Sequence, residues 1–221
     1  MGKHFIVSKG MFIAVYGPDG VGKSTLIREL AKKFLNISDG NVRVFHFRPG
    51  LLPILGDKLL GASGIVRSGN PYIKRPYRKL VGYIKLIYLL LDFFLGYLLK
   101  IKPLLKKKFI VFFDRYFLDT IIDGERMRLK INPKLLFYIY NNFIPKPRLT
   151  IHLYAPPEVI IKRKKDLSIE RVKNLLNKYA VILSKDRFVL SINTASLTID
   201  DEVRLILAKI QELGKNEYRS H

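Results

Sequence analysis

The residues most able to do chemistry stand together near the start of the chain. The stretch GPDGVGKS, residues 17–24, matches the spacing G-x-x-x-x-G-K-[ST]. Glycines let such a loop curl so that its N–H groups point at phosphate, and the helix that follows adds positive partial charge. We therefore predict a site for nucleoside triphosphate phosphates formed by Gly17, Asp19, Gly20, Val21, Gly22, Lys23, Ser24 and Thr25.

Two members of this loop have distinct expected tasks. Lys23 would reach the β- and γ-phosphates, and the hydroxyl of Ser24 would bind Mg²⁺. An apolar run, 11–16, precedes the loop and an amphipathic segment follows it, which is the context that the motif requires. The motif alone does not separate a kinase from a GTPase, an ATPase motor or a nucleotide-dependent switch.

A second candidate group is FIVFFDRYFLD, residues 109–119, which places Asp114 and Arg115 where a buried strand ends. Ligands of open α/β sheets bind at the carboxyl edge of the strands. An acid there can hold Mg²⁺ and an arginine can grip a second phosphate through two hydrogen bonds. The alternative is a surface ion pair that caps the strand. We predict Asp114 as a metal ligand and Arg115 as a phosphate ligand.

The elements that must position these residues alternate along the chain. Short apolar runs rich in β-branched and aromatic residues predict strands, and the segments between them predict helices. The expected strands are 11–16, 42–47, 109–113, 149–154 and 187–192, and the expected helices are 23–35, 51–61, 77–100, 132–143, 157–165, 168–184 and 199–213. This order predicts an α/β fold with a parallel five-stranded sheet, helices on both faces and one domain over 1–221.

The composition limits the partners and the compartment. There is no cysteine, which excludes disulfides and thiolate metal sites. The N-terminal residues 1–10 lack a long apolar stretch, so we expect no secretory signal and a cytoplasmic protein. The chain carries 40 Lys+Arg against 18 Asp+Glu, a net charge of +22. This excess indicates either a polyanionic partner or a lysine-rich surface kept in solution by repulsion.

One apolar segment, residues 80–99, has nearly the length of a membrane span. Lys85 and Asp92 lie inside it, and both of its flanks are basic, so no orientation signal emerges. We therefore predict a long buried helix and no membrane span, with a membrane-associated helix as the alternative.

Together these motifs resemble the thymidylate kinase family of nucleoside monophosphate kinases. GPDGVGKST is followed at a distance by a strand ending in Asp-Arg-Tyr, and FRPG at 47–50 resembles the family's Arg-Glu-Pro-Gly without its glutamate. The stretch LTIHLYAPPEVIIKRKK, 149–165, resembles the family's strand, Pro-Glu and arginine-bearing helix. The helix at 168–184, with Tyr179, resembles the element after the family's lid.

The resemblance implies a division of roles. The loop and Lys23 would hold ATP, while Ser24 and Asp114 would hold Mg²⁺. Asp19 would contact the acceptor sugar, and the acceptor phosphate would be held by Arg48 and Arg115. It also implies a homodimer formed through long apolar helices.

The resemblance further implies a lid around 162–170, bordered by the basic run 162–165. Arg163 of this run joins Lys23, Asp114 and Arg115 as an expected catalytic residue, although the run is equally typical of a solvated helix face. Asn193, Thr194 and Ala195 would approach the adenine base.

One stretch departs from the family. After Asp-Arg-Tyr the chain reads FLDTIIDG, so Asp119 replaces a serine and Asp123-Gly124 replace the Tyr-Gln pair that helps recognise thymine. We expect an ATP-dependent phosphotransferase with dTMP as the leading acceptor. The alternatives are a kinase for another small acceptor, such as a nucleoside or sugar, and an ATPase acting on nucleic acid or a membrane surface.

Smaller signals carry weaker expectations. His46 and His152 have no partner at metal-ligand spacing, so we expect ordinary strand residues. Tyr72, Tyr77 and Tyr83 alternate with basic residues, a pattern that suits single-stranded nucleic acid, an acceptor pocket or, as we expect here, a plain surface loop.

Overall fold

The computed structural model describes residues 10–37, 41–53, 76–165, 167–186 and 188–216. Its centre is one parallel sheet of strands β1 (Met11–Tyr16), β2 (Val42–His46), β3 (Ile110–Asp114), β4 (Leu149–Tyr154) and β5 (Val189–Asn193), in the order β2-β3-β1-β4-β5. The expected five-stranded parallel sheet is therefore confirmed.

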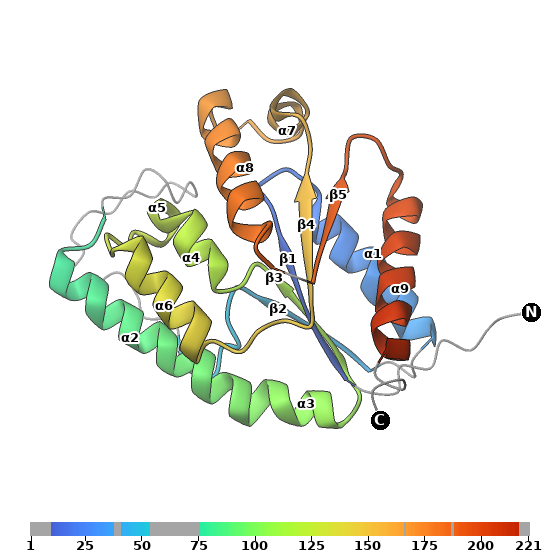
Figure 1. Cartoon of the computed structure of the whole chain (residues 1–221), viewed down its shortest axis with the longest axis horizontal. Helices are drawn as coiled ribbons and strands as arrows, with labels where there is room; N and C mark the ends of the chain where they lie inside the picture. Colours follow the sequence, from blue (N-terminus) through green and yellow to red (C-terminus); the bar gives the residue numbers. More distant parts are fainter. Residues whose placement is uncertain (1–9, 38–40, 54–75, 166, 187, 217–221) are drawn as a thin grey trace, which may run out of the picture.

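Helices cover both faces of the sheet, as predicted (Figure 1). They are α1 (Lys23–Ile37), α2 (Lys79–Gly96), the π-helical segment η1 (Tyr97–Ile101), α3 (Lys102–Lys106), α4 (Leu118–Ile122), α5 (Gly124–Met127), α6 (Pro133–Phe143), α7 (Pro157–Arg163), α8 (Ile169–Leu183) and α9 (Ile199–Asn216). Helices α1 and α9 pack on one face, and α2, α4, α6 and α8 lie on the other. All six residues of β1 are buried, which explains its continuous apolar run.

The predicted elements agree with this order, with small shifts at their ends. Within the expected helix 51–61, residues 51–53 are not helical and the remainder lies outside the described residues, as do Tyr72 and the basic residues beside it. The short helices α4 and α5 were not predicted. They follow Asp114 and Arg115 directly and carry the segment that departs from the thymidylate kinase pattern.

The apolar segment 80–99 forms α2 and the start of η1, so the predicted helix is confirmed, but it is buried along one side only. Asp92 is fully buried, and Lys85 donates a hydrogen bond to the Met127 carbonyl, so both charges face the protein. Helix α2 and the start of η1 also expose apolar side chains, a set we call the α2 stripe: Leu80, Tyr83, Ile84, Ile87, Leu91, Phe94 and, in η1, Leu98. Over the described residues, no helix combines the length and the apolarity needed to cross a bilayer.

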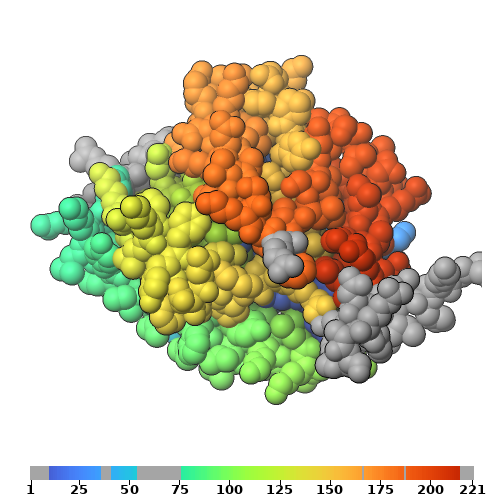
Figure 2. All heavy atoms as spheres, viewed as in Figure 1, coloured from blue at the N-terminus to red at the C-terminus, as the bar shows by residue number. Residues whose placement is uncertain are grey.

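Strand register sets the edge on which chemistry is possible. Asp114 ends β3 and pairs in register with Val15 of β1 and His46 of β2. The carboxyl ends of the three strands therefore meet beside the loop that follows β1. Helices α7 and α8 project beyond this edge of the sheet (Figure 1), and Figure 2 shows them as a protrusion at the top of the molecule.

Candidate nucleotide-binding site

The loop between β1 and α1 requires its glycines. Gly17 and Gly22 have φ angles of +145° and +110°, which L side chains rarely adopt. A Cβ atom on Gly17 would lie 2.5 Å from the Leu153 carbonyl oxygen, whereas one on Gly22 would meet nothing within 4 Å. The backbone at Gly22 thus borders open space at the N-terminus of α1, which is the place that a phosphate cradle needs.

Lys23 is buried at the base of this loop. Its Nζ donates hydrogen bonds of 2.8 Å to the carbonyl oxygens of Gly17 and Pro18. Burial, helped by the charge of Arg115, lowers the pKa of Lys23 to about 7, against the opposing effect of Asp19 and Asp114. The ammonium group is therefore poorly compensated here, and bound phosphate would favour its charged form.

Ser24 and Asp114 meet as the sequence predicted, 90 positions apart in the chain. The Ser24 hydroxyl donates to Asp114 Oδ2 at 3.1 Å, and the buried Oδ1 accepts no hydrogen bond from the described residues. Burial would raise the pKa of Asp114, but His46, Lys23 and Arg115 hold it below its ordinary value. A hydroxyl beside an ionised carboxylate with a spare oxygen is a donor set that suits Mg²⁺.

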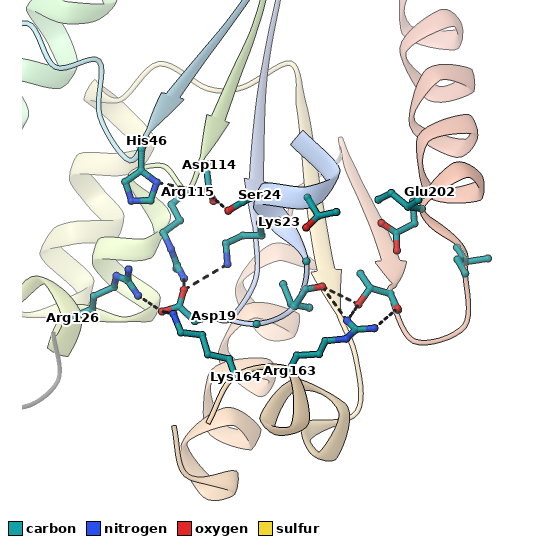
Figure 3. Close-up of a pocket in the computed structure, with 17 residues that line it drawn as sticks. Asp19, Lys23, Ser24, His46, Asp114, Arg115, Arg126, Arg163, Lys164 and Glu202 are labelled. Carbon is teal, nitrogen blue, oxygen red and sulfur yellow. Dashed lines mark hydrogen bonds and ion pairs between the residues drawn. The ribbon is translucent and has the colours of Figure 1, made fainter. Parts of the chain in front are cut away.

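Asp19 lies among cations at one end of the cavity, which we call the acceptor end (Figure 3). Arg115 Nη2 and Arg126 Nη1 each donate to one of its carboxylate oxygens at 2.5 Å, and Lys23 and Lys164 place their Nζ atoms 3.9 Å away. Burial would raise the pKa of Asp19, but the charges of these arginines and Lys23 hold it far below its usual value.

Arg115 is held in place from several sides. Its side chain is 2% exposed, and its guanidinium also binds Asp119 and the hydroxyl of Tyr179. The backbone of Arg115 has φ +69°, a conformation that costs a non-glycine residue of the order of 1–3 kcal/mol. The surrounding ion pairs offset this cost and aim the guanidinium at Asp19.

Arg48 is not among the residues that line this cavity. Its Nη1 donates to the buried Asp92 Oδ2 at 2.9 Å, and the backbone N–H groups of Gly50 and Leu52 also donate to Asp92. The acid inside the apolar helix α2 thus holds the loop after β2. The proposed contact of Arg48 with an acceptor remains a prediction.

The opposite end of the cavity lies between α7, the loop after β5 and α9, and we call it the base end. Arg163 donates to the hydroxyl and the carbonyl of Thr194 at 2.9 Å each, and the Thr194 hydroxyl donates to the Val21 carbonyl. Arg163 therefore joins the phosphate loop to the loop after β5. Glu202 of α9 lines the same end.

Of the residues predicted to bind phosphate, metal or acceptor or to act in catalysis, all but Gly17 and Arg48 line one cavity of about 580 Å³. The residues that line it are Asp19, Gly20, Val21, Gly22, Lys23, Ser24, Thr25, His46, Asp114, Arg115, Arg126, Arg163, Lys164, Thr194, Leu197, Ile199 and Glu202. Arg126 and Glu202 were not predicted. Neither belongs to a recognisable pattern, and only the folding of α5 and α9 brings them to the site.

Comparison with known proteins identifies the fold. No protein-family model matches the sequence, and no curated protein matches it. The structure is similar to thymidylate kinase from Candida albicans, with a TM-score of 0.64, 21% identity and 92% of both chains covered. It is also similar to thymidylate kinase from Ehrlichia chaffeensis, with a TM-score of 0.59, 20% identity, and coverage of 92% of this chain and 99% of the other. The predicted resemblance is thus confirmed for the fold.

Proposed function

We propose that this protein is an ATP-dependent nucleoside monophosphate kinase, with dTMP as the leading acceptor. The observation that carries the proposal is the phosphate loop with Ser24 and Asp114 in contact beside it, facing the arginine-lined acceptor end. Its fold, shared with the two thymidylate kinases, supports the same class of reaction. A cytoplasmic location stays a prediction.

The mechanism works by placement and charge. The loop amides and Lys23 would hold the ATP phosphates, and Ser24 and Asp114 would hold Mg²⁺, which neutralises phosphate charge when bound. Arg115, positioned by Asp119 and Tyr179, would hold the acceptor phosphate in line with the loop. Asp19 holds Arg115 and Arg126 in place, and its two oxygens keep lone pairs that could accept a hydrogen bond from an acceptor hydroxyl.

The segment around 162–170 is our proposed lid. Lys164 already reaches Asp19, and Arg163 connects α7 to the phosphate loop and Thr194. A movement of α7 would therefore change contacts at both ends of the cavity. We count Arg163 as a catalytic candidate for this reason.

The direct test is ADP release from ATP and Mg²⁺ with a panel of nucleoside monophosphates. We expect turnover with at least one of them, and dTMP first. Tight ATP binding with no turnover on any monophosphate would contradict the proposal.

A second candidate acceptor class, a nucleoside or sugar, is favoured by one observation. Asp119, which stands where the family has serine, is fully buried and spent on Arg115 and Tyr179. It is therefore not available to a base, so thymine recognition would need other groups. Turnover of nucleosides or sugars, with none of monophosphates, would favour this candidate.

We also propose a homodimer that buries the α2 stripe. This stripe contains no charged side chain, and Leu80 and Ile87 are 74% and 58% exposed. Exposed apolar patches of this kind mark interaction surfaces, and two copies of the stripe would cover each other.

The test is the mass in solution of wild type and of Ile87→Lys, with Leu205→Lys on α9 as the matched control. We expect a dimer for wild type and the control, and a monomer for Ile87→Lys. A monomeric wild type that sediments with neutral vesicles would instead indicate a membrane surface as the partner.

We propose no specific nucleic acid partner despite the charge of +22. Binding to DNA at low salt should disappear as the salt rises toward physiological levels, because counterion release drives such contacts. Affinity that survives moderate salt would favour the nucleic-acid-dependent ATPase instead.

A further inference from the structure

Glu202 is a largely buried acid that accepts no hydrogen bond from the residues that the structure describes. Its side chain is 4% exposed, and it makes no hydrogen bond or ion pair with any residue that the structure describes. Burial raises the pKa of Glu202, although the charge of Arg163 opposes this. Its carboxylate oxygens are not among the fully buried atoms without a partner, so they open onto the cavity, where a ligand could reach them.

The position of Glu202 in α9 does not by itself explain why this side chain faces the cavity. Acidic side chains in the first turn stabilise a helix, and the first turn of α9 contains Asp200, Asp201 and Glu202. Asp200 is exposed, and Asp201 accepts a hydrogen bond from the Thr198 hydroxyl. Glu202 alone of the three is buried and lines the cavity.

The arrangement of residues along the cavity indicates which part of a bound nucleotide would contact Glu202. Phosphates belong at Lys23 and Ser24, where the loop and α1 present their N–H groups. Figure 3 shows Glu202 on the other side of these residues from Asp19 and Arg126. Leu197 and Ile199 line the same cavity just before Glu202 in the chain, and they offer apolar surface to a flat ring. A nucleotide held at the loop would therefore place its base near Glu202.

We propose that Glu202 selects the donor nucleotide by accepting a hydrogen bond from an amino group of its base. The inference rests on the proposed function and deepens it. The amino group of adenine and the N1–H and amino groups of guanine are all donors that a carboxylate accepts. A purine without these donors leaves Glu202 buried and unpaired, so the site should reject it.

The experiment is calorimetric binding of ATP, GTP and purine riboside triphosphate, which lacks the amino group, to the full chain. Wild type should bind ATP or GTP on the order of 10- to 100-fold more tightly than purine riboside triphosphate. The tighter of the two identifies the base. Glu202→Leu should lose this preference, Glu202→Gln should keep part of it through its amide oxygen, and the exposed Glu212→Leu on the same helix should keep all of it.

Two results would overturn the inference while leaving the proposed function intact. One is equal affinity of wild type for all three triphosphates. The other is an equal loss of affinity for all three in Glu202→Leu, which would place the carboxylate on the ribose or in a purely structural role. Failure of wild type to bind any triphosphate would instead refute the proposed function, and the inference with it. Thermal unfolding of each variant shows that the fold is kept.

Discussion

The charged side chains at the two ends of the cavity differ in how many partners they have. At the acceptor end, Asp19 is bound by Arg115 and Arg126, and Arg115 is bound again by Asp119 and Tyr179. At the base end, Arg163 is bound by Thr194, and Glu202 has no partner among the described residues.

This difference suits the two ends to different tasks: one positions the reacting groups, and the other discriminates between nucleotides. Paired charges hold their geometry before any ligand arrives, so the acceptor end would have little to reorganise if it binds phosphate as we propose. A buried carboxylate without a partner gains most from a ligand that supplies a donor, so its energy depends on which ligand is bound. The acceptor end should therefore control catalysis and stability, and the base end should control which nucleotide enters.

The largest effect is expected where both ends meet, at Lys23. Lys23→Ala should lower kcat/KM roughly 10³-fold, because the cation that neutralises phosphate charge is lost from a buried site. Steady-state kinetics measure this, and Lys32→Ala, an exposed lysine of α1, is the control. A comparable loss of kcat/KM in the two variants would contradict the role of Lys23 in binding phosphate.

The next effect tests whether the ion pairs of the acceptor end also contribute to the free energy of unfolding. Asp119→Ala leaves the guanidinium of Arg115 buried with one carboxylate fewer, and it should lower the free energy of unfolding by about 3–5 kcal/mol. Urea denaturation measures the change, with the exposed Asp200→Ala as the control. A loss below about 1 kcal/mol would show that Arg115 finds other partners or water.

A smaller effect is expected in the pH dependence of stability, through His152, whose ring packs on Tyr179. The His152 ring stacks on Tyr179 with centroids 5.9 Å apart, and burial lowers the pKa of His152 to about 4. The unfolded chain has the higher pKa, about 6.5, and therefore binds more protons between these values. Stability should be complete above about pH 6.5 and fall as the pH drops toward 4.

Between about pH 7 and pH 5 the loss should be about 2 kcal/mol, measured by urea denaturation at each pH. His152→Phe should remove this dependence while keeping an aromatic ring against Tyr179. An unchanged pH profile in that variant would assign the effect to other groups.

The smallest effect tests whether the acceptor end and the base end act independently. Arg126 is 20% exposed, and Arg126→Ala should raise the acceptor KM roughly tenfold while ATP affinity stays unchanged. Arg204→Ala, an exposed arginine of α9, is the control. A parallel loss of ATP affinity in Arg126→Ala would mean that the two ends are not independent.

Much of the fold was predictable because its signals are local. The run at 11–16, the glycines of 17–22 and Lys23 lie within a few residues of one another, so their spacing sets the loop before any tertiary contact forms. The meeting of Ser24 with Asp114 was also predictable, because carboxyl ends of parallel strands share one edge.

Other parts of the site have no local signal. Arg126 reaches Asp19 across 107 positions, and Asp92 reaches Arg48 across 44. Each of these acids can pair with many cations in a chain of net charge +22, and the sequence does not rank them. Nor does it distinguish Glu202 from Asp200 and Asp201 beside it.

The parallel sheet, the loop motif of residues 17–24 and the acid and arginine at the end of β3 were predictable from the sequence alone. These depend on short-range spacing and on strand ends sharing an edge. Other features emerged only from the folded chain: two arginines hold Asp19, Asp92 holds Arg48, and Glu202 faces the cavity with no hydrogen bond from the described residues. A buried charge is stabilised by the groups packed around it, and those groups come from distant segments that only folding brings together.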